Sequence, residues 1–146
     1  MVECIFKATG KVIHGFGRGS KELGIPTANL DDTVVKAIPK LMMPGVYAGF
    51  AQVKDGPVYP MVMSLGWNPF YKNVKKSLEV HILNTFEKDF YDEQLSIVVL
   101  RYIRPERDFE TLEKLIEEIQ NDIAITVKLL QNPEYRNYAM DPIFKL

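Results

Sequence analysis

The sequence VYAGFAQVKDGPVYPMVMSL at residues 46–65 indicates the fold class. Its two halves, Val46–Val53 and Val58–Leu65, are rich in the β-branched and aromatic residues that strands favour. Between them, Lys54-Asp55-Gly56-Pro57 has the composition of a hairpin turn, in which Asp-Gly tolerates positive φ. These residues therefore predict two antiparallel strands joined by a tight turn.

Three further segments of the same kind flank this hairpin, at Glu3–Phe16, Ser77–Leu83 and Gln94–Ile103. Pro and Gly residues punctuate the connections, and no helical period separates the segments. The crossover helices of a βαβ fold are therefore missing, and the spacing favours a small antiparallel barrel.

The last third of the chain changes period and predicts a helix over about 109–131. Asp108 is its expected N-cap, and Asn132-Pro133 is expected to end it. The tail, 132–146, has weak periodicity, so it is expected either to lie along the domain surface or to be partly mobile. The barrel is expected to occupy about 3–104. Apolar residues at helical spacing predict one buried face: Leu112, Leu115, Ile116, Ile119, Ile123, Val127 and Leu130.

Length and composition indicate a single soluble domain over residues 1–146. A net charge of −1 argues against nucleic acid and anionic membranes as partners. The single Cys4 excludes an internal disulfide, and no apolar run approaches the ~20 residues that span a bilayer. The N-terminus lacks a signal-peptide core. We therefore expect a cytoplasmic monomer.

Residues 15–24, GFGRGSKELG, hold four glycines together with Arg18 and Lys21. Such a loop can bring its backbone N–H groups and positive charge close to a phosphate. A Walker loop counted from Gly15 fails at Ser20, and a dinucleotide fingerprint fails at the same residue. Two interpretations stay open from composition: a phosphate-binding loop, or a glycine-rich hairpin loop on a barrel rim.

The following Pro26-Thr27-Ala28-Asn29 is the second candidate site. Pro26 holds the preceding residue extended, and Thr27 and Asn29 would project to the same face of an extended chain. A hydroxyl and an amide oxygen are hard donors that suit a magnesium ion otherwise bound by phosphates and water. Spacing alone equally permits a turn in which both side chains bond their own backbone.

Several runs together resemble the riboflavin kinase family. They are GRGSKELGIPTANL at 17–30, PGVY at 44–47, SLGWNPFYKN at 64–73, KSLEVHI at 76–82, DFY at 89–91, and YIRPE at 102–106. They follow the family's order and span most of residues 10–125. The GWNPFYKN run is similar to the eukaryotic, stand-alone form rather than to the module fused to bacterial FAD synthetases.

The resemblance implies a six-stranded antiparallel Greek-key barrel with a C-terminal helix packed against it. It implies transfer of the γ-phosphate of ATP to the ribityl 5′-hydroxyl of riboflavin, giving FMN and ADP, with Mg²⁺ as the metal and Mn²⁺ or Zn²⁺ as alternatives. The implied roles are Glu79 as catalytic base, Thr27 and Asn29 as metal ligands, Gly15, Gly17, Lys21, Thr27, Ile82 and Tyr91 at ATP, and Arg104 and Phe109 at the flavin.

Other interpretations remain open at this point. Glu79 alternates with apolar Leu78 and Val80, so it faces outward, where a glutamate is usually a solvated surface residue. A non-catalytic flavin- or nucleotide-binding barrel could dispense with it. An oligonucleotide-binding barrel is disfavoured by the net charge and the acidic helix. A piece of a bifunctional enzyme that makes FAD is the third alternative, although Met1 directly before the first strand favours a complete chain.

Overall fold

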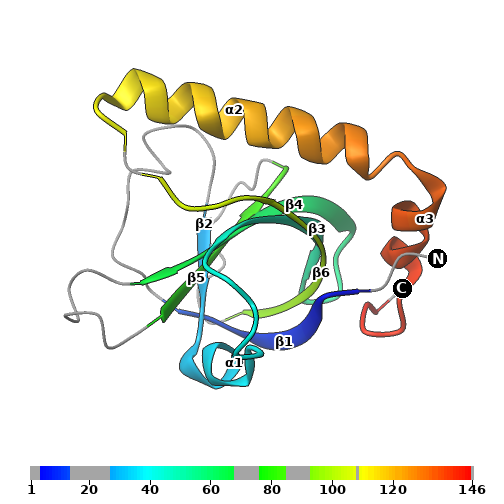
Figure 1. The fold of residues 1–146 in the computed structure, drawn as a ribbon. Coiled ribbons are helices and arrows are strands. Elements are labelled where there is room, and N and C mark those ends of the chain that lie inside the picture. The colour runs from blue at the N-terminus through cyan, green and yellow to red at the C-terminus, as the bar shows by residue number, and fades with distance from the viewer. Residues whose placement is uncertain (1–3, 14–26, 68–75, 85–92, 108, 146) are drawn as a thin grey trace.

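In the computed structural model, six antiparallel strands close into a barrel that a long helix crosses on its outside (Figure 1). The structure describes residues 4–13, 27–67, 76–84, 93–107 and 109–145. The strands are β1 (Phe6–Ile13), β2 (Thr27–Leu30), β3 (Gly45–Val53), β4 (Val58–Trp67), β5 (Lys76–Ile82) and β6 (Gln94–Arg104). The helices are α1 (Asp32–Ala37), α2 (Leu112–Leu129), α3 (Pro133–Arg136) and the 3₁₀ turn η2 (Asn137–Met140).

The strand order around the barrel is β1-β2-β5-β4-β3-β6, and all six neighbouring pairs are antiparallel. Strands β3, β4 and β5 form a meander, and the preceding β2 pairs with β5, which is a Greek key. The predicted barrel class and all five strands predicted from patterning are confirmed. The sixth strand, β2, is the Thr27–Leu30 part of the run discussed above.

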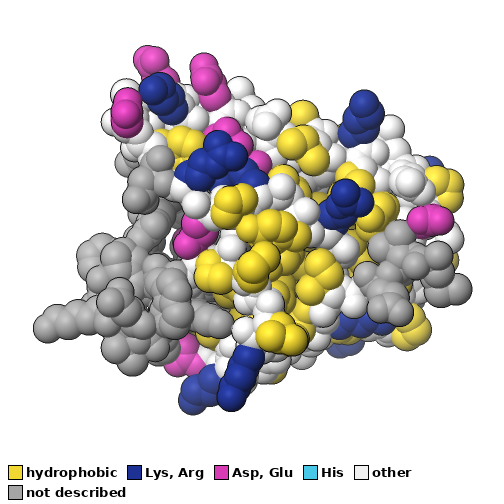
Figure 2. Space-filling view, viewed as in Figure 1, with side chains coloured by type: hydrophobic (Ala, Val, Ile, Leu, Met, Phe, Trp, Pro, Cys, Tyr) yellow, Lys and Arg dark blue, Asp and Glu magenta, His cyan; other side chains and the backbone are white. Residues whose placement is uncertain are grey.

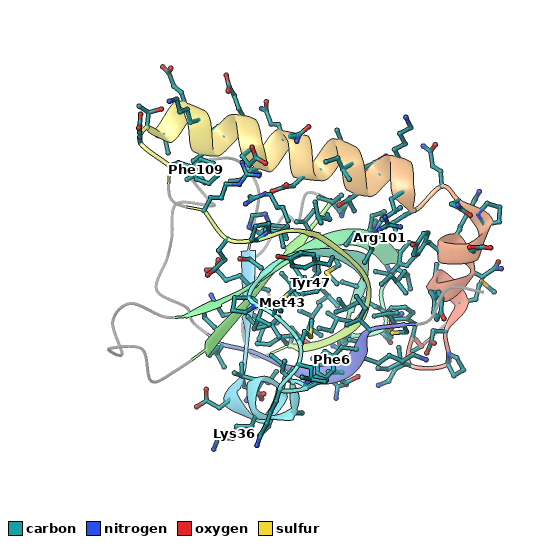
Figure 3. The ribbon with its side chains drawn as sticks, in the orientation of Figure 1. Phe6, Lys36, Met43, Tyr47, Arg101 and Phe109 are labelled. Carbon is teal, nitrogen blue, oxygen red and sulfur yellow. The ribbon has the colours of Figure 1, made fainter. Side chains whose placement is uncertain are left out.

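The barrel is filled by the alternate residues of its strands. Met63 of β4, Val80 of β5 and Ile97 of β6 are fully buried inside the barrel. The residues before and after each of them on the same strand point outward. Figure 2 shows hydrophobic side chains gathered over the barrel end that faces the viewer, and Figure 3 places Tyr47 and Met43 there. The Tyr47 hydroxyl donates to the backbone carbonyl of Met43, which fixes the segment that closes this end.

The β3–β4 hairpin is confirmed, but the residue with a left-handed backbone differs from the prediction. Lys54 has φ of 56°, whereas neither Asp55 nor Gly56 has positive φ. The Gly56 N–H donates to the Val53 carbonyl at 3.0 Å, and Gln52 pairs with Val58. The turn therefore places its strained residue at its first position.

Helix α2 begins later than predicted. Thr111 is its N-cap and accepts a hydrogen bond from the Lys114 N–H at 3.2 Å, so the prediction of Asp108 as the cap is wrong. The helix ends at Leu129, and Asn132 then caps the new short helix α3, in whose first turn Pro133 lies. No helix in the described ranges is long and apolar enough to cross a membrane.

The apolar stripe predicted for α2 is confirmed in part, because four of its members are half-buried and one is buried: Leu115, Ile116, Ile119 and Ile123, and Leu130. Two of its members are exposed. Leu112 and Val127 are 59% and 43% exposed. In contrast, Asp122 is 2% exposed and Thr126 is fully buried, on the side that packs against β3 and β4. A carboxylate and a hydroxyl thus occupy the centre of the interface between helix and barrel, which raises the question of what satisfies them.

The C-terminal tail packs firmly on the outer face of the barrel. Tyr135 and Phe144 are buried against Phe50 of β3 and against Val98 and Leu100 of β6. Gln52 of β3 is fully buried beside them: its amide Nε2 donates to the carbonyls of Gly56 at 2.8 Å and Lys145 at 2.7 Å. Its Oε1 accepts from the Lys145 N–H at 2.9 Å. One side chain therefore bonds both backbone groups of Lys145.

Replacing Gln52 tests how much this contact holds the tail. Gln52→Leu keeps the volume but leaves the Lys145 N–H and carbonyl without their partner. We expect the free energy of unfolding, measured in urea, to fall by about 2 kcal/mol. Gln94→Leu, at an exposed position of β6, is the matched control and should change it by less than about 0.5 kcal/mol. Equal effects of the two variants would contradict the assignment.

His81 on β5 is half-buried on the outward side of its strand. Burial penalises the charged imidazolium and lowers the pKa of His81 to about 4. The side chain is therefore neutral at physiological pH. Since an unfolded histidine titrates near pKa ~6.5, the unfolded chain binds a proton between about pH 6.5 and 4 that the folded chain does not.

This difference predicts that stability falls as pH falls through that window. His81 should account for about 2 to 3 kcal/mol of the loss in unfolding free energy between pH 7 and 4.5, and His81→Gln should remove that share. Asp31, whose pKa is lowered by the hydrogen bond from Thr33, stays ionised there. Urea denaturation at several pH values measures the difference, and parallel pH profiles for the two proteins would refute it.

Candidate active site

Strands β2 and β5 bring together two residues that are far apart in the sequence. Asn29 pairs directly with Glu79, and Thr27 pairs with His81. Ala28 and Val80, the pair between them, are 1% and 0% exposed and face the core. Asn29 and Glu79 therefore face outward, and directly opposed Cβ atoms lie about 5 Å apart. The predicted metal ligand Asn29 and the predicted base Glu79 are neighbours on the barrel surface.

Glu79 also has a neighbour on its other side. Ser64 of β4 pairs with Glu79, Val46 of β3 pairs with Ser64, and Arg104 at the end of β6 pairs with Val46. We call Asn29, Glu79, Ser64, Val46 and Arg104 the cross-strand row. Strands lie ~4.8 Å apart, so Glu79 and Arg104 are separated by roughly 14 Å along the sheet.

The centre of the row is not an ordinary solvated surface. Val46 is 6% exposed, and Asn29, Glu79 and Ser64 are half-buried. A half-buried carboxylate between an amide and a hydroxyl differs from the freely solvated surface glutamate that an outward strand position usually gives. Glu79 therefore lies in partial shelter, where a ligand could cover it.

A second carboxylate lies beside the row, and the sequence analysis assigned it no role. A Cβ built on Gly66 of β4 would lie 1.9 Å from Oε1 of Glu106. The absence of a side chain at Gly66 is thus what admits Glu106 to this face of β4. Gly66 pairs with Ser77, two residues before Glu79 on β5.

Arg104 ends the row and is held by acidic residues of α2. Its Nε and Nη2 donate to the two carboxylate oxygens of Asp122, each at 2.8 Å, and Glu118 lies 3.3 Å from Nε. The hydrogen bonds to Asp122 raise the pKa of Arg104 above its ordinary value, so the guanidinium is permanently charged. Its Cζ is 5.8 Å from the centroid of the Phe109 ring, a cation–π distance.

The two residues predicted at the flavin, Arg104 and Phe109, are therefore adjacent, and Figure 3 shows Phe109 beneath the N-terminal end of α2. Gly45 lets β3 start close to them. Its φ is 152°, and a Cβ there would lie 2.5 Å from the backbone oxygen of Arg104. Any other residue at position 45 would push the end of β6 away from β3.

The remaining residues predicted at the nucleotide either lie in the barrel core or fall outside the described residues. Ile82 is 1% exposed and belongs to the barrel core, so its side chain points away from the outer face and only its backbone could meet a nucleotide. Gly15, Gly17, Lys21 and Tyr91 lie outside the described residues. Within the described ranges no group of three or more His, Cys, Asp or Glu side chains could hold a metal.

Besides Glu106, the sequence analysis also missed Asp122. The signal was present in the helical period, because Asp122 and Thr126 fall between Ile119, Ile123 and Leu130 on the side predicted to be apolar. A charge in such a stripe indicates a buried partner. The partner, Arg104, could not be read from the sequence, since it lies on a strand that pairs with β3.

Comparisons with known proteins agree with this geometry. The family model described as riboflavin kinase (flavokinase) matches residues 3–130. The riboflavin kinase of Mus musculus is 50% identical over 141 residues, covering 97% of this chain and 91% of the relative. That of Homo sapiens is 50% identical over 137 residues, covering 94% and 88%.

The solved structure of riboflavin kinase from Trypanosoma brucei has a TM-score of 0.78 and 27% identity to this chain, covering 99% of it and 88% of that protein. This likeness and the mammalian relatives confirm both the predicted barrel and the resemblance to the eukaryotic type. The chain therefore belongs to the riboflavin kinase family.

Proposed function

We propose that this chain transfers the γ-phosphate of ATP to the ribityl 5′-hydroxyl of riboflavin, releasing FMN and ADP, with the reaction centred on the cross-strand row. Family membership supplies the reaction. The observation that supports the residue roles is the register that runs Asn29–Glu79–Ser64–Val46–Arg104 across five strands. One end of the row suits phosphate and metal, and the other suits an aromatic ring.

The roughly 14 Å between Glu79 and Arg104 fits one extended substrate. A flavin whose ring lies at Arg104 and Phe109 would run its ribityl chain along the row toward Glu79. The terminal hydroxyl would then reach the carboxylate, next to Asn29. The charged guanidinium donates hydrogen bonds, and the Phe109 ring offers a planar apolar surface. An isoalloxazine ring has hydrogen-bond acceptors at its edge and a planar aromatic face, so it suits both groups.

Glu79 is the proposed general base. Phosphoryl transfer has a loose transition state, so positioning and charge neutralisation dominate and the alcohol loses its proton late. A carboxylate within hydrogen-bond reach can orient the hydroxyl and then accept that proton. His81, which burial keeps neutral, is two residues away and adds no positive charge that would stabilise the carboxylate against protonation.

Thr27 and Asn29 are the proposed metal ligands. A hydroxyl and an amide oxygen are hard, neutral donors, and the half-buried position of Asn29 beside Glu79 fits a Mg²⁺ ion, or Mn²⁺ or Zn²⁺, that takes its other ligands from phosphates and water. When bound, the ion would neutralise charge on the β- and γ-phosphates. Asn29 and Thr27 would thereby hold ATP at the Glu79 end of the row.

The nucleotide would lie beyond β2. Gly15, Gly17 and Lys21 precede this strand in the chain, and we assign them to the phosphates, with Tyr91 and the backbone of Ile82 at the nucleotide. We also expect the chain to act as a monomer in the cytoplasm. Analytical ultracentrifugation and cell fractionation would test those two expectations separately from the reaction.

The reaction is tested by incubating the purified chain with riboflavin, ATP and Mg²⁺ and separating the flavins by chromatography. FMN should form only when ATP and metal are both present. Glu79→Gln should lower kcat by about 10²–10⁴-fold, because the amide cannot accept the proton. Glu117→Gln, on the exposed side of α2, is the matched control and should leave turnover unchanged. Normal turnover of Glu79→Gln would remove Glu79 from the mechanism.

Substitutions of the metal ligands should behave differently from Glu79→Gln. Thr27→Ala and Asn29→Ala should each raise the KM for MgATP and lower turnover, with a steeper dependence on free Mg²⁺ than the wild type shows. Asn121→Ala, exposed on α2, is the control for Asn29→Ala. Kinetics like those of the wild type at limiting Mg²⁺ would exclude both residues as ligands.

A further inference from the structure

The interaction that carries a further inference is the pair between Arg104 and Asp122. Asp122 grips one edge of the guanidinium, through Nε and Nη2, with both bonds at 2.8 Å. The side chains are 11% and 4% exposed, respectively. This bidentate geometry fixes both the position and the plane of the guanidinium, which a single hydrogen bond would not do.

A buried ion pair contributes little net stability to the contact between the helix and the barrel. Burying two charges carries a desolvation penalty that their pairing does little more than offset, and apolar residues of similar size often serve stability equally well. The neighbouring Thr126 hydroxyl is also buried, and no partner for it lies in the described part of the chain. These polar groups at the centre of the interface therefore indicate that the pair serves to hold the Arg104 guanidinium in one orientation.

That geometry leaves part of the guanidinium available. Of its five N–H groups, Nε and one on Nη2 bond Asp122, and one on Nη1 bonds the Pro105 carbonyl at 3.2 Å. Within the residues the structure describes, one N–H remains on each of Nη1 and Nη2. The Phe109 ring lies 5.8 Å from the guanidinium carbon. Two donors and an aromatic face are thus presented together.

We propose that Asp122 is a positioning residue for the flavin: it fixes Arg104 so that these two N–H groups face paired acceptors of the isoalloxazine ring. The pyrimidine part of that ring carries carbonyl oxygens next to ring nitrogens, which match such a fork. The proposal rests on the assignment of Arg104 to the flavin made above. Asp122 and Glu118 also offset the positive charge, so this end of the row favours a neutral ring over a phosphate.

The test measures binding rather than turnover. Riboflavin affinity is obtained from the quenching of flavin fluorescence, and ADP affinity in the presence of Mg²⁺ from calorimetry. Asp122→Asn removes the charge and one acceptor, and should raise the riboflavin Kd about 10-fold or more while the ADP Kd changes by less than about twofold. Glu117→Gln, one exposed acid on the same helix, should change neither.

A second substitution and a double variant separate positioning from folding. Asp122→Glu keeps the charge but displaces the carboxylate by one methylene, so it should show the same selective loss even if Asp122→Asn folds poorly. Arg104→Lys should weaken riboflavin binding, and adding Asp122→Asn to Arg104→Lys should cause no further loss. Additive losses in the double variant would overturn the inference, because Asp122 would then act other than through Arg104.

Two other outcomes have clear meanings. An unchanged riboflavin Kd together with a lower melting temperature would make Asp122 purely structural and overturn the inference. Selective loss of riboflavin binding in the variants, with no FMN formed by the wild-type chain, would support the inference while refuting the proposed transfer reaction.

Discussion

The register of β2 against β5 is the constraint on which the rest of the site depends. Asn29 stands opposite Glu79 because Ala28 and Val80 face inward, where both are almost completely buried. Side chains alternate along a strand, so a slip of one residue would bury Asn29 and turn Ala28 outward. The hydrophobic core thus specifies the surface: the same alternation that fills the barrel also aligns polar residues from strands that lie far apart in the sequence.

The helix packed on the barrel adds a second constraint at the other end of the row. Most helices attach to a sheet through an apolar face, but α2 places Asp122 and Thr126 at the centre of its contact with β3 and β4. A separate apolar cluster on the outer face of the barrel buries Tyr135 and Phe144 of the tail. This division allows the helix to orient Arg104 while the tail secures the fold.

Much of the fold could be predicted from the sequence. The period of two identified five strands, and the period of 3.6 identified α2. The sixth strand has only four residues, too few for a periodic signal, and the expectation of a six-stranded Greek-key barrel came from the family resemblance. Local errors had local causes: the turn strains Lys54 rather than Asp55, and Thr111 rather than Asp108 caps α2. In the site, Thr27, Asn29 and Glu79 were identified as candidates. The alignment of Asn29 and Glu79 with Arg104, and the role of Asp122 as the partner of Arg104, depend on pairings across the barrel.

The bonds between Gln52 and Lys145 join residues separated by 93 positions in the chain. On a ribosome, the residues of β3 leave the exit tunnel long before their partner in the tail has been made. The barrel strands can pair in the meantime. The outer face of β3, including the Gln52 amide, stays open to water until Lys145 has been made. A nascent chain halted before the tail is made would therefore leave Phe50 and Val98, which the tail covers in the folded protein, open to water and to chaperones.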